Sequence, residues 1–315
     1  MSPFFLRSST PFLAIDVSSE SLQLLEVRVT KNRYQLQNYS THPLPANCVI
    51  QQRISDITAF SQILANAVNQ FKPRAKQAIL ALPVNQVITK TLPILSHLSP
   101  SEVTKHIQYE VLAQMPTSTE IYWDYAYISA MPRGTKATTQ EISIVIAQQT
   151  SITPYLQAFN HCHLPLCTID VESYALARAW CWAYSHQTSE PNLHALLLLR
   201  AQLITLVLMQ GKRVLYARGC PVEAQVPYDV ALLPCIQQLW STLPLNPDWP
   251  AITQIGLVGE CAQQTYAALL SVELAVPVFL LELGNEFLAG QKFSFIEPSK
   301  LFLSLGLCLW GKDDF

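Results

Sequence analysis

An acidic residue followed closely by two serines, near the start of the chain, is the first candidate for chemistry. Asp16 lies near the end of the apolar run 12–17, and Ser18 and Ser19 stand in the turn before the next apolar run, 22–29. An aspartate can bind a metal ion, and N–H groups in a tight turn can hold phosphate oxygens. The same pattern fits a plain β-hairpin bend, because serine favours turns. The residues alone leave both interpretations open.

Two further polar clusters have a chemical and a structural interpretation, and for both we favour the structural one. The segment HCHLPLC, residues 161–167, lacks the usual spacing of four zinc ligands, so buried cysteines and loop histidines are favoured. Asp170 and Glu172 have the spacing of an acid–base pair. Because they lie where a strand passes into a helix, we interpret them as residues that cap the helix and complement the dipole at its N-terminus. The common nucleotide-loop, metalloprotease and serine-hydrolase motifs do not occur.

Composition limits the classes of function. The 315 residues are enough for about two domains. Half of them are hydrophobic, 13% are charged, the net charge is −2, and no cluster of Lys and Arg could neutralise several phosphates. We therefore expect no nucleic-acid partner. The eight cysteines are scattered without a Cys-x-x-Cys pair, which is typical of reduced, buried thiols.

The chain shows no pattern of secretion or membrane insertion. Its N-terminal segment lacks the apolar core and cleavage site of a signal peptide. Its most apolar stretch, residues 193–209, is interrupted by His194, Arg200 and Gln202, whereas a membrane span needs about 20 nearly uncharged residues. We expect a soluble, cytoplasmic protein.

The two halves of the chain repeat one order of elements. In the first, three short apolar runs are followed by a helix with one apolar stripe, 55–71, and a buried strand, 78–83. In the second, three runs within 196–217 are followed by a helix at about 230–243 and a strand at 252–259. Each half then adds a helix, a strand and a last helix, the last helices lying at 172–185 and at about 299–309. This order predicts an α/β protein with two mixed-sheet domains.

One segment, 87–148, interrupts the first half and is predicted to be a small inserted α+β subdomain. It reads as a strand, a helix and two more strands. Ser99 and Glu102 have the spacing of a capping box, with Pro100 in the first turn, and the helix is expected to end at Met115–Pro116. The predicted boundaries are 1–86 with 149–190 for the first domain, 87–148 for the insert and 191–315 for the second domain.

Several segments in this order resemble the actin-like proteins of type IV pilus assembly, the PilM family, and more distantly FtsA. The similar segments are AIDVSSESLQLLEV, YSTHPLP, AILALPVNQVITKTLPI, IQYEVLAQMP with YWDYAYI, IDVESYALARAW, LVGECA and EPSKLFLSLGLCLWG. The resemblance spans almost the whole chain. It implies a duplicated actin-like, ribonuclease H-like fold with a nucleotide between two Asp-containing hairpins.

The chain departs from that family at the nucleotide site. Asp16 is present, but Ala14 and Gln23 replace the usual Gly and Lys, and the second hairpin reads LLRA, residues 198–201, without its Asp. The turn at 259–261 is Gly-Glu-Cys, and only 9 glycines occur in all. The usual insertion of the second domain also lacks room between Gly219 and the following helix.

These departures favour a degenerate nucleotide site. One carboxylate without its partner holds Mg²⁺ poorly, because the ion needs a near-octahedral set of oxygens. We therefore interpret Asp16, Ser18, Ser19 and Gly259 as a vestigial nucleotide site in a protein that is not an enzyme and has no cofactor. Residual binding of ATP with Mg²⁺ is the alternative.

The resemblance implies a protein partner: the N-terminal cytoplasmic tail of the inner-membrane protein PilN, bound in a groove between the insert and the first domain. It also implies association with the inner membrane through that partner, and contacts with other pilus assembly proteins or motor ATPases. An extended, partly apolar peptide would bind strands and aromatic side chains. The insert supplies candidate contacts at Tyr109, Glu110, Tyr122, Trp123, Asp124, Tyr125 and Tyr127.

Strand alternation places Tyr122 and Asp124 on one face and Trp123, Tyr125 and Tyr127 on the other. The sequence does not determine which face is core. Three other functions stay open: an active ATPase of the same fold, the cytoplasmic domain of a type II secretion L protein, and, more remotely, a sugar or acetate kinase. The L protein continues into a membrane helix, whereas this chain ends at residue 315.

Overall fold

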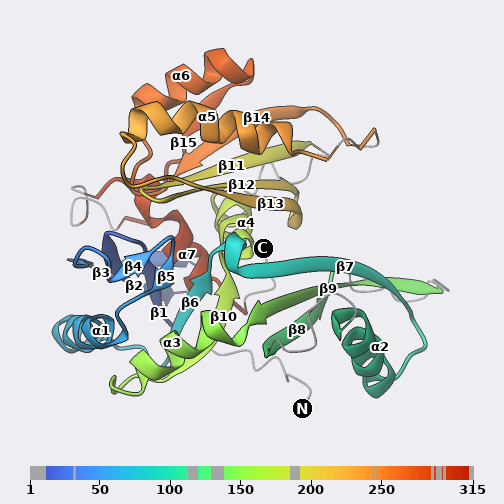
Figure 1. Cartoon of the computed structure of the whole chain (residues 1–315), viewed down its shortest axis with the longest axis horizontal. Coiled ribbons are helices and arrows are strands. Elements are labelled where there is room, and N and C mark those ends of the chain that lie inside the picture. The colour runs from blue at the N-terminus through green and yellow to red at the C-terminus, as the bar shows by residue number, and fades with distance from the viewer. Residues whose placement is uncertain are drawn as a thin grey trace. The chain divides into compact units, whose positions relative to one another are not determined.

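The computed structural model describes residues 12–30, 33–112, 120–128, 138–184, 192–244, 246–247, 249–284, 287–288, 293 and 296–311. Two compact units are present: the insert unit, Asn85–Thr153, and the body, which comprises the remaining described residues. Figure 1 shows the elements of both. The helix end expected at Met115–Pro116 lies outside the described residues.

The body contains two five-stranded sheets with the same strand order. The first has the order β10-β6-β1-β2-β3, with β1 (Leu13–Val17), β2 (Ser21–Thr30), β3 (Arg33–Pro43), β6 (Ala78–Leu82) and β10 (Leu166–Val171). The second has the order β15-β14-β11-β12-β13, with β11 (Leu193–Arg200), β12 (Leu203–Gln210), β13 (Arg213–Pro221), β14 (Ile252–Val258) and β15 (Val278–Leu280). In each sheet the three strands that come first in the chain, β1–β3 and β11–β13, pair antiparallel. The two later strands, β6 and β10 or β14 and β15, run parallel to the first of the three. The predicted fold class, a duplicated actin-like α/β fold, is confirmed.

Helices cover both sheets and fill the space between them (Figure 1). The first sheet is covered on its outer face by α1 (Ile57–Phe71) and α3 (Gln149–Phe159), which meet through the rings of Phe60 and Tyr155. The outer face of the second sheet is covered by α5 (Tyr228–Ser241) and α6 (Gln264–Leu274). Between the sheets lie α4 (Glu172–Ala183) and α7 (Phe302–Cys308), in one core with apolar side chains from both. This double coverage explains why β11 is buried along its whole length.

The structure differs from the sequence prediction in the place of α7. Its position in the chain assigned it to the second domain, but it packs on α4 and on β1 and β2 of the first sheet. Every residue of α7 is buried, and a Cβ at Gly306 would lie 1.8 Å from the carbonyl oxygen of Ala175. The helix has no polar face, so only the central layer between two apolar surfaces can hold it.

Two helix starts are capped by side chains. The carboxylate of Asp56 caps α1 by accepting a hydrogen bond from the N–H of Ala59 at 2.9 Å. In α2 (Pro100–Leu112), Glu102 accepts a hydrogen bond from the Ser99 N–H at 2.8 Å, and the Ser99 hydroxyl accepts one from the Glu102 N–H at 3.4 Å. The predicted capping box is confirmed.

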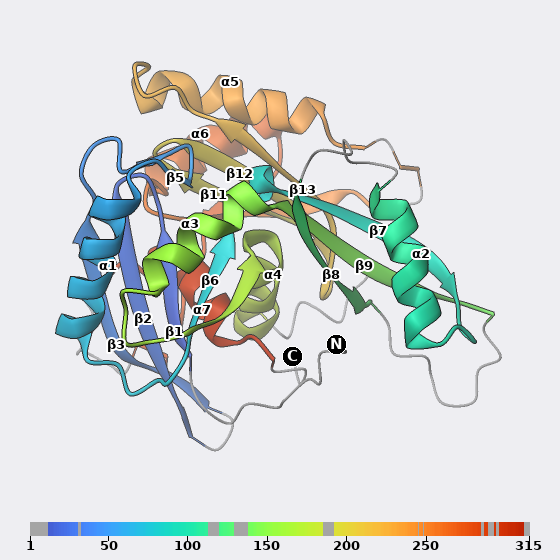
Figure 2. The same cartoon turned by 60° about the horizontal axis from the view of Figure 1, so that its bottom comes forward.

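The insert unit has one three-stranded sheet with α2 on one face (Figure 2). Its strand order is β7-β9-β8, with β7 (Val87–Leu95), β8 (Ile121–Tyr127) and β9 (Thr139–Gln148), all antiparallel. Val103, Ile107 and Val111 of α2 pack against Ile142, Ile144 and Ile146 of β9 in a core of their own. The insert unit therefore has a hydrophobic core separate from the core around α4 and α7 and from the core under α5 and α6.

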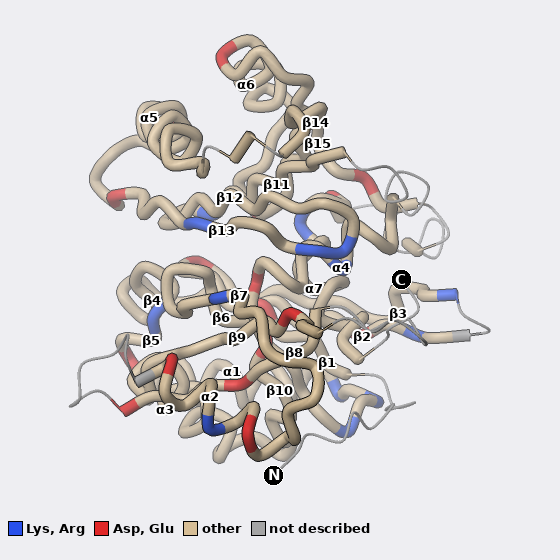
Figure 3. Tube along the Cα trace, turned by 90° about the vertical axis from the view of Figure 1, so that its right-hand side faces the viewer, with Lys and Arg blue, Asp and Glu red and all other residues tan. Residues whose placement is uncertain are grey.

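The remaining short elements are β4 (Val49–Ile50), β5 (Arg53–Ile54), η1 (Val84–Gln86) and η3 (Pro298–Leu301). Only residues 222–227 connect β13 to α5, so the short connection predicted in the second half is present. Figure 3 shows charged residues of both signs thinly spread along the described trace, in keeping with their 13% share of the sequence. Among the described helices, none combines the length and the apolarity that a membrane crossing requires.

Candidate functional site

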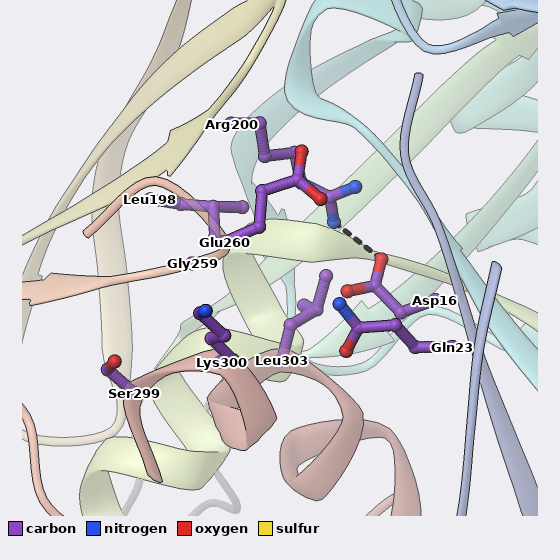
Figure 4. A pocket seen from close by; sticks show the side chains of 9 residues that line it. All are labelled: Asp16, Gln23, Leu198, Arg200, Gly259, Glu260, Ser299, Lys300 and Leu303. Atoms are coloured by element: carbon purple, nitrogen blue, oxygen red, sulfur yellow. Dashed lines mark hydrogen bonds and ion pairs between the residues drawn. The ribbon is translucent and has the colours of Figure 1, made fainter. Parts of the chain in front are cut away.

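A charge cluster lies where the two sheets of the body approach each other (Figure 4). Asp16 lies near the end of β1, and Arg200 is the last residue of β11, the counterpart of β1 in the second sheet. Glu172 is the first residue of α4, and Glu260 lies in the turn after β14. The duplicated topology therefore brings strand ends from both halves of the chain to one place.

Arg200 is the centre of this cluster, and only 4% of its side chain is exposed. Its Nη2 lies 2.6 Å from Oδ1 of Asp16, and its Nη1 donates to the carbonyl oxygen of Val17 at 2.7 Å. A longer hydrogen bond, 3.3 Å, joins Nη1 to Oε1 of Gln52. All three acceptors belong to the first half of the chain, whereas Arg200 belongs to the second.

Glu172 supplies a second carboxylate to the same guanidinium. Its Oε2 lies 3.8 Å from Nη2 of Arg200, and its Oε1 accepts a hydrogen bond from the Thr205 hydroxyl at 2.7 Å. Its side chain is 2% exposed. Thr205 is in β12 of the second sheet, so this hydrogen bond also joins the two halves of the body.

Glu260 closes the cluster from the turn of residues 259–261. Its Oε2 accepts a hydrogen bond from the Ser18 hydroxyl at 2.8 Å, and its Oε1 accepts one from the Ala201 N–H at 3.3 Å. Gly259 makes this turn possible, because its φ is +108° and a Cβ there would lie 2.5 Å from the Leu199 carbonyl oxygen.

Burial and neighbouring charges shift the pKa of three groups in the cluster, Glu172, Glu260 and Arg200. Burial raises the pKa of Glu172 above its ordinary value, while Arg200 and the hydrogen bond from Thr205 oppose that rise. Burial likewise raises the pKa of Glu260, again opposed by Arg200 and by Ser18. For Arg200 the neighbouring acids, Asp16 first, outweigh burial and raise the pKa. The guanidinium is therefore charged at any physiological pH.

Little space remains among these side chains. Asp16, Gln23, Arg200, Glu260 and Lys300 are among the residues that line a cavity of about 10 Å³, roughly the room that one water molecule needs. The Ser18 N–H already donates to the Ser21 carbonyl oxygen at 2.9 Å. The hairpin of β1 and β2 therefore uses that N–H group for its own bend.

Of the predicted nucleotide-site residues, the structure brings Asp16, Ser18 and Gly259 together around this cluster. Ser19 is buried in the same turn, and its hydroxyl has no hydrogen-bond partner among the described residues. The sequence prediction did not identify Arg200, Glu172 and Glu260 as the central residues of this charge cluster. A charged residue at the end of LHALLLLR, an otherwise almost wholly apolar strand, was the available signal.

The capping part of the interpretation of Asp170 and Glu172 is wrong, although Glu172 does lie in the first turn of α4. The N-cap of α4 is Val171, which makes no side-chain capping hydrogen bond. The Asp170 carboxylate instead forms an ion pair with Arg178, and Glu172 points into the Arg200 cluster. Glu172 keeps the favourable position of an acid at a helix N-terminus, but its carboxylate is held by two residues distant in the sequence, Arg200 and Thr205.

The aromatic residues of the insert unit divide between the two faces of its sheet. Ile121, Trp123 and Tyr125 of β8 pack against the core under α2, whereas Tyr122 and Asp124 are exposed on the opposite face. The side chains of Tyr109 and Glu110 project from α2, and Glu110 pairs with Lys90 at 3.0 Å.

Tyr127 follows Trp123 and Tyr125 in the strand alternation and is in ring contact with Tyr125, yet it is 46% exposed. The structure therefore does not bring the seven predicted partner-binding residues to one surface.

The segment HCHLPLC follows α3 as a turn leading into β10. Its Cys162 thiol lies 3.8 Å from the carbonyl oxygen of Ala158, and burial raises the pKa of that thiol to about 11. Within the described part of the chain, no three His, Cys, Asp or Glu side chains are grouped so as to hold a metal ion.

Comparison with solved structures shows a strong similarity to a known complex. A structure described as the PilM-PilN type IV pilus biogenesis complex matches over 96% of this chain and 98% of that chain, with 17% identity and a TM-score of 0.77. Two weaker matches each have 11% identity. The cytoplasmic domain of EpsL, from the type II secretion system of Vibrio cholerae, covers 94% of this chain and 93% of that one, with a TM-score of 0.49. A Bacteroides thetaiotaomicron protein with an actin-like ATPase fold covers 91% and 97%, with a TM-score of 0.48.

The sequence itself matches a protein family. The family described as type IV pilus assembly protein PilM matches residues 14–222, which is more than half of the 315 residues. The matched region begins at the hairpin of Asp16, includes the whole insert unit and ends just after β13. The chain therefore belongs to the PilM family of type IV pilus assembly proteins.

Proposed function

We propose that this protein is a cytoplasmic, non-enzymatic scaffold of type IV pilus assembly that binds the N-terminal tail of a PilN-like inner-membrane protein. The observation that carries the proposal is membership of the PilM family over residues 14–222. The similarity to a structure described as a PilM-PilN complex supports it. The protein would reach the inner membrane through this partner.

The insert unit offers a suitable surface for an extended peptide. Among its described residues β8 pairs only with β9, so its other edge is free of a neighbouring strand. The strand contains no proline and no lysine, the residues that commonly protect an edge from further pairing. An extended tail can add to such an edge through backbone hydrogen bonds.

Side chains beside this edge match a partly apolar, basic tail. Tyr122 is 43% exposed and Asp124 is exposed on the same face. The ring of Tyr122 provides apolar contact area and Asp124 attracts a Lys or Arg of the tail. We therefore propose that the peptide binds along β8, on the face that carries Tyr122 and Asp124. Trp123 and Tyr125 support that strand from its other face.

A synthetic peptide with the sequence of the cognate PilN-like N-terminal tail tests this proposal. We expect it to bind with micromolar or tighter affinity and to raise the Tm of the protein, as a ligand of the native state does. Failure of the unmodified protein to bind this peptide by calorimetry, with no change in Tm, would contradict the proposal.

The surface is tested by a matched pair of variants. Tyr122→Ala is expected to weaken binding by roughly tenfold or more, because exposed aromatic anchors carry much of the energy of an interface. Tyr109→Ala removes the same kind of side chain from α2, where it is 74% exposed on the other side of the insert sheet. It is expected to bind like the unmodified protein, and an equal loss in both variants would place the peptide elsewhere.

The scaffold function is proposed to need no nucleotide. Two observations support this. Arg200 makes hydrogen bonds that join the two sheets, and the second hairpin contains no Asp. The competing function, an ATPase whose nucleotide state controls the partner, is favoured by one observation, the presence of Asp16. Titration of the tail peptide with and without Mg-ATP separates the two: we expect equal dissociation constants, whereas a nucleotide-dependent shift would favour the ATPase.

A further inference from the structure

Arg200 lies between the first hairpins of the two halves of the body. In the actin-like fold that the sequence resembles, the phosphates of a magnesium nucleotide lie between the first hairpins of the two halves. Here those hairpins are β1–β2 and β11–β12, and the guanidinium of Arg200 extends from the end of β11 to the end of β1. Figure 4 shows this side chain directed at Asp16.

Several hydrogen bonds join the two halves of the body at this place. Arg200 donates to the Asp16 carboxylate and the Val17 carbonyl oxygen. Beside it, Ser18 donates to Glu260 at 2.8 Å, and the Gln51 N–H donates to Oε1 of Gln202 at 2.9 Å. A bound magnesium nucleotide would connect the same strand ends through its phosphates.

The Arg200 guanidinium is surrounded by the carboxylates of Asp16, Glu172 and Glu260. Lys300 also lines the cavity, but its ammonium pairs with Glu297 at 2.8 Å. A buried guanidinium satisfies carboxylates with fixed geometry and cannot lose its proton. Its N–H groups are donors, so they cannot replace the oxygen ligands that Mg²⁺ requires. The residues present, with a cavity of about 10 Å³ between them, do not fit a magnesium nucleotide.

We propose that the Arg200 guanidinium is a built-in cation that joins the two halves of the body in place of a magnesium nucleotide. The contacts of Arg200 then hold the two sheets together without a bound ligand. This inference goes beyond the proposed scaffold function and does not depend on the partner that the insert unit binds.

Chemical rescue of Arg200→Ala tests it. This variant leaves the carboxylates without their cation, and we expect its Tm to fall by roughly 10 °C. Guanidinium chloride at roughly 20 mM, far below the molar concentrations that denature proteins, should raise the Tm of Arg200→Ala by several degrees. An equal concentration of NaCl should not, because sodium cannot reproduce the planar set of hydrogen bonds.

The controls separate this effect from general ionic stabilisation. Arg218→Ala removes an exposed arginine from β13 and should show neither the large loss nor the rescue. If Arg200→Ala does not fold, Arg200→Lys keeps the charge without the planar fork and should retain part of the Tm. A Tm of Arg200→Ala equal to that of the unmodified protein, or a lack of response to guanidinium, would overturn the proposal.

The unmodified protein supplies an independent test. We expect no rise in its Tm with Mg-ATP at millimolar concentration, because the position of the phosphates is taken by Arg200. A rise in Tm with Mg-ATP that Asp16→Ala abolishes would overturn the inference. Neither result depends on the tail peptide, so this inference and the scaffold proposal can fail separately.

Discussion

Asp16 shows how the role of one carboxylate depends on its partner. Its Oδ1 lies 2.6 Å from Nη2 of Arg200, in a site where the arginine is 4% exposed and the aspartate 12%. A buried ion pair adds little to stability compared with apolar residues of the same volume, but removal of one partner leaves the other charge unpaired. Asp16 is therefore more important to the folded protein than an exposed acid would be.

We predict that Asp16→Ala lowers the free energy of unfolding by about 3–5 kcal/mol, because it leaves the Arg200 guanidinium without its nearest anion. Urea denaturation measures this change. Glu20→Ala, at an exposed position in the same hairpin, is the matched control and should change stability by less than ~0.5 kcal/mol. Equal effects of the two substitutions would contradict the pairing of Asp16 with Arg200.

Glu260 gives a prediction for pH. Its pKa in the folded protein is raised, chiefly by burial, so the folded state binds a proton more readily than the unfolded state does. Its contribution to stability is therefore greatest at low pH and is lost as the pH rises through the raised pKa.

We predict that Glu260→Gln is at least as stable as the unmodified protein near pH 8, and that the unmodified protein gains relative to it as the pH falls towards about 5. Thermal unfolding of both proteins across this range measures the difference. The opposite slope would show that Arg200 and Ser18, rather than burial, control the ionisation of Glu260.

At the scale of elements, the central pair of helices determines how the two sheets are joined. The backbones of α4 and α7 approach closely at Gly306, and Arg178 of α4 also donates to the Gly306 carbonyl oxygen at 3.1 Å. A side chain at residue 306 would separate two helices that both sheets enclose, and the close-packed core leaves no room for that movement.

We predict that Gly306→Ala lowers the free energy of unfolding by about 1–3 kcal/mol or more, the usual cost of overpacking a core. Gly284→Ala is the matched control, because a Cβ at Gly284 would meet no atom within 4 Å. Denaturant unfolding of the two variants gives the comparison. A stable Gly306→Ala would show that α4 and α7 can move apart.

At the scale of the whole molecule, the insert unit and the body are held by different cores. Elements with separate cores open with separate free energies, and hydrogen exchange reports each one. Ile107, which is fully buried on the face of α2 that packs against β9, belongs only to the core of the insert unit.

We predict that Ile107→Ala lowers the local stability of the insert unit by about 2–5 kcal/mol. Amides of β7, β8 and β9 should exchange faster, while those of β11 and β12 keep their protection. Hydrogen exchange followed by mass spectrometry measures both sets in one experiment. Loss of protection in both would mean that the two units unfold together.

The sequence by itself determined the features that depend on neighbouring residues. The order of strands and helices, its repetition in the two halves and the capping box of Ser99 and Glu102 follow from local periodicity and local hydrogen bonds. The short connection at 222–227 is of the same kind. Local rules suffice for them because the partners lie within a few residues of each other.

Only the tertiary structure decided the contacts between distant residues. Arg200 and Asp16 are 184 positions apart, and no local pattern predicts that they pair. The same holds for the role of Glu172, for the place of α7 between the sheets, and for the face of β8 that packs against α2. Each depends on which surfaces the folded chain brings together, because burial and long-range charge partners outweigh local preference once water is excluded.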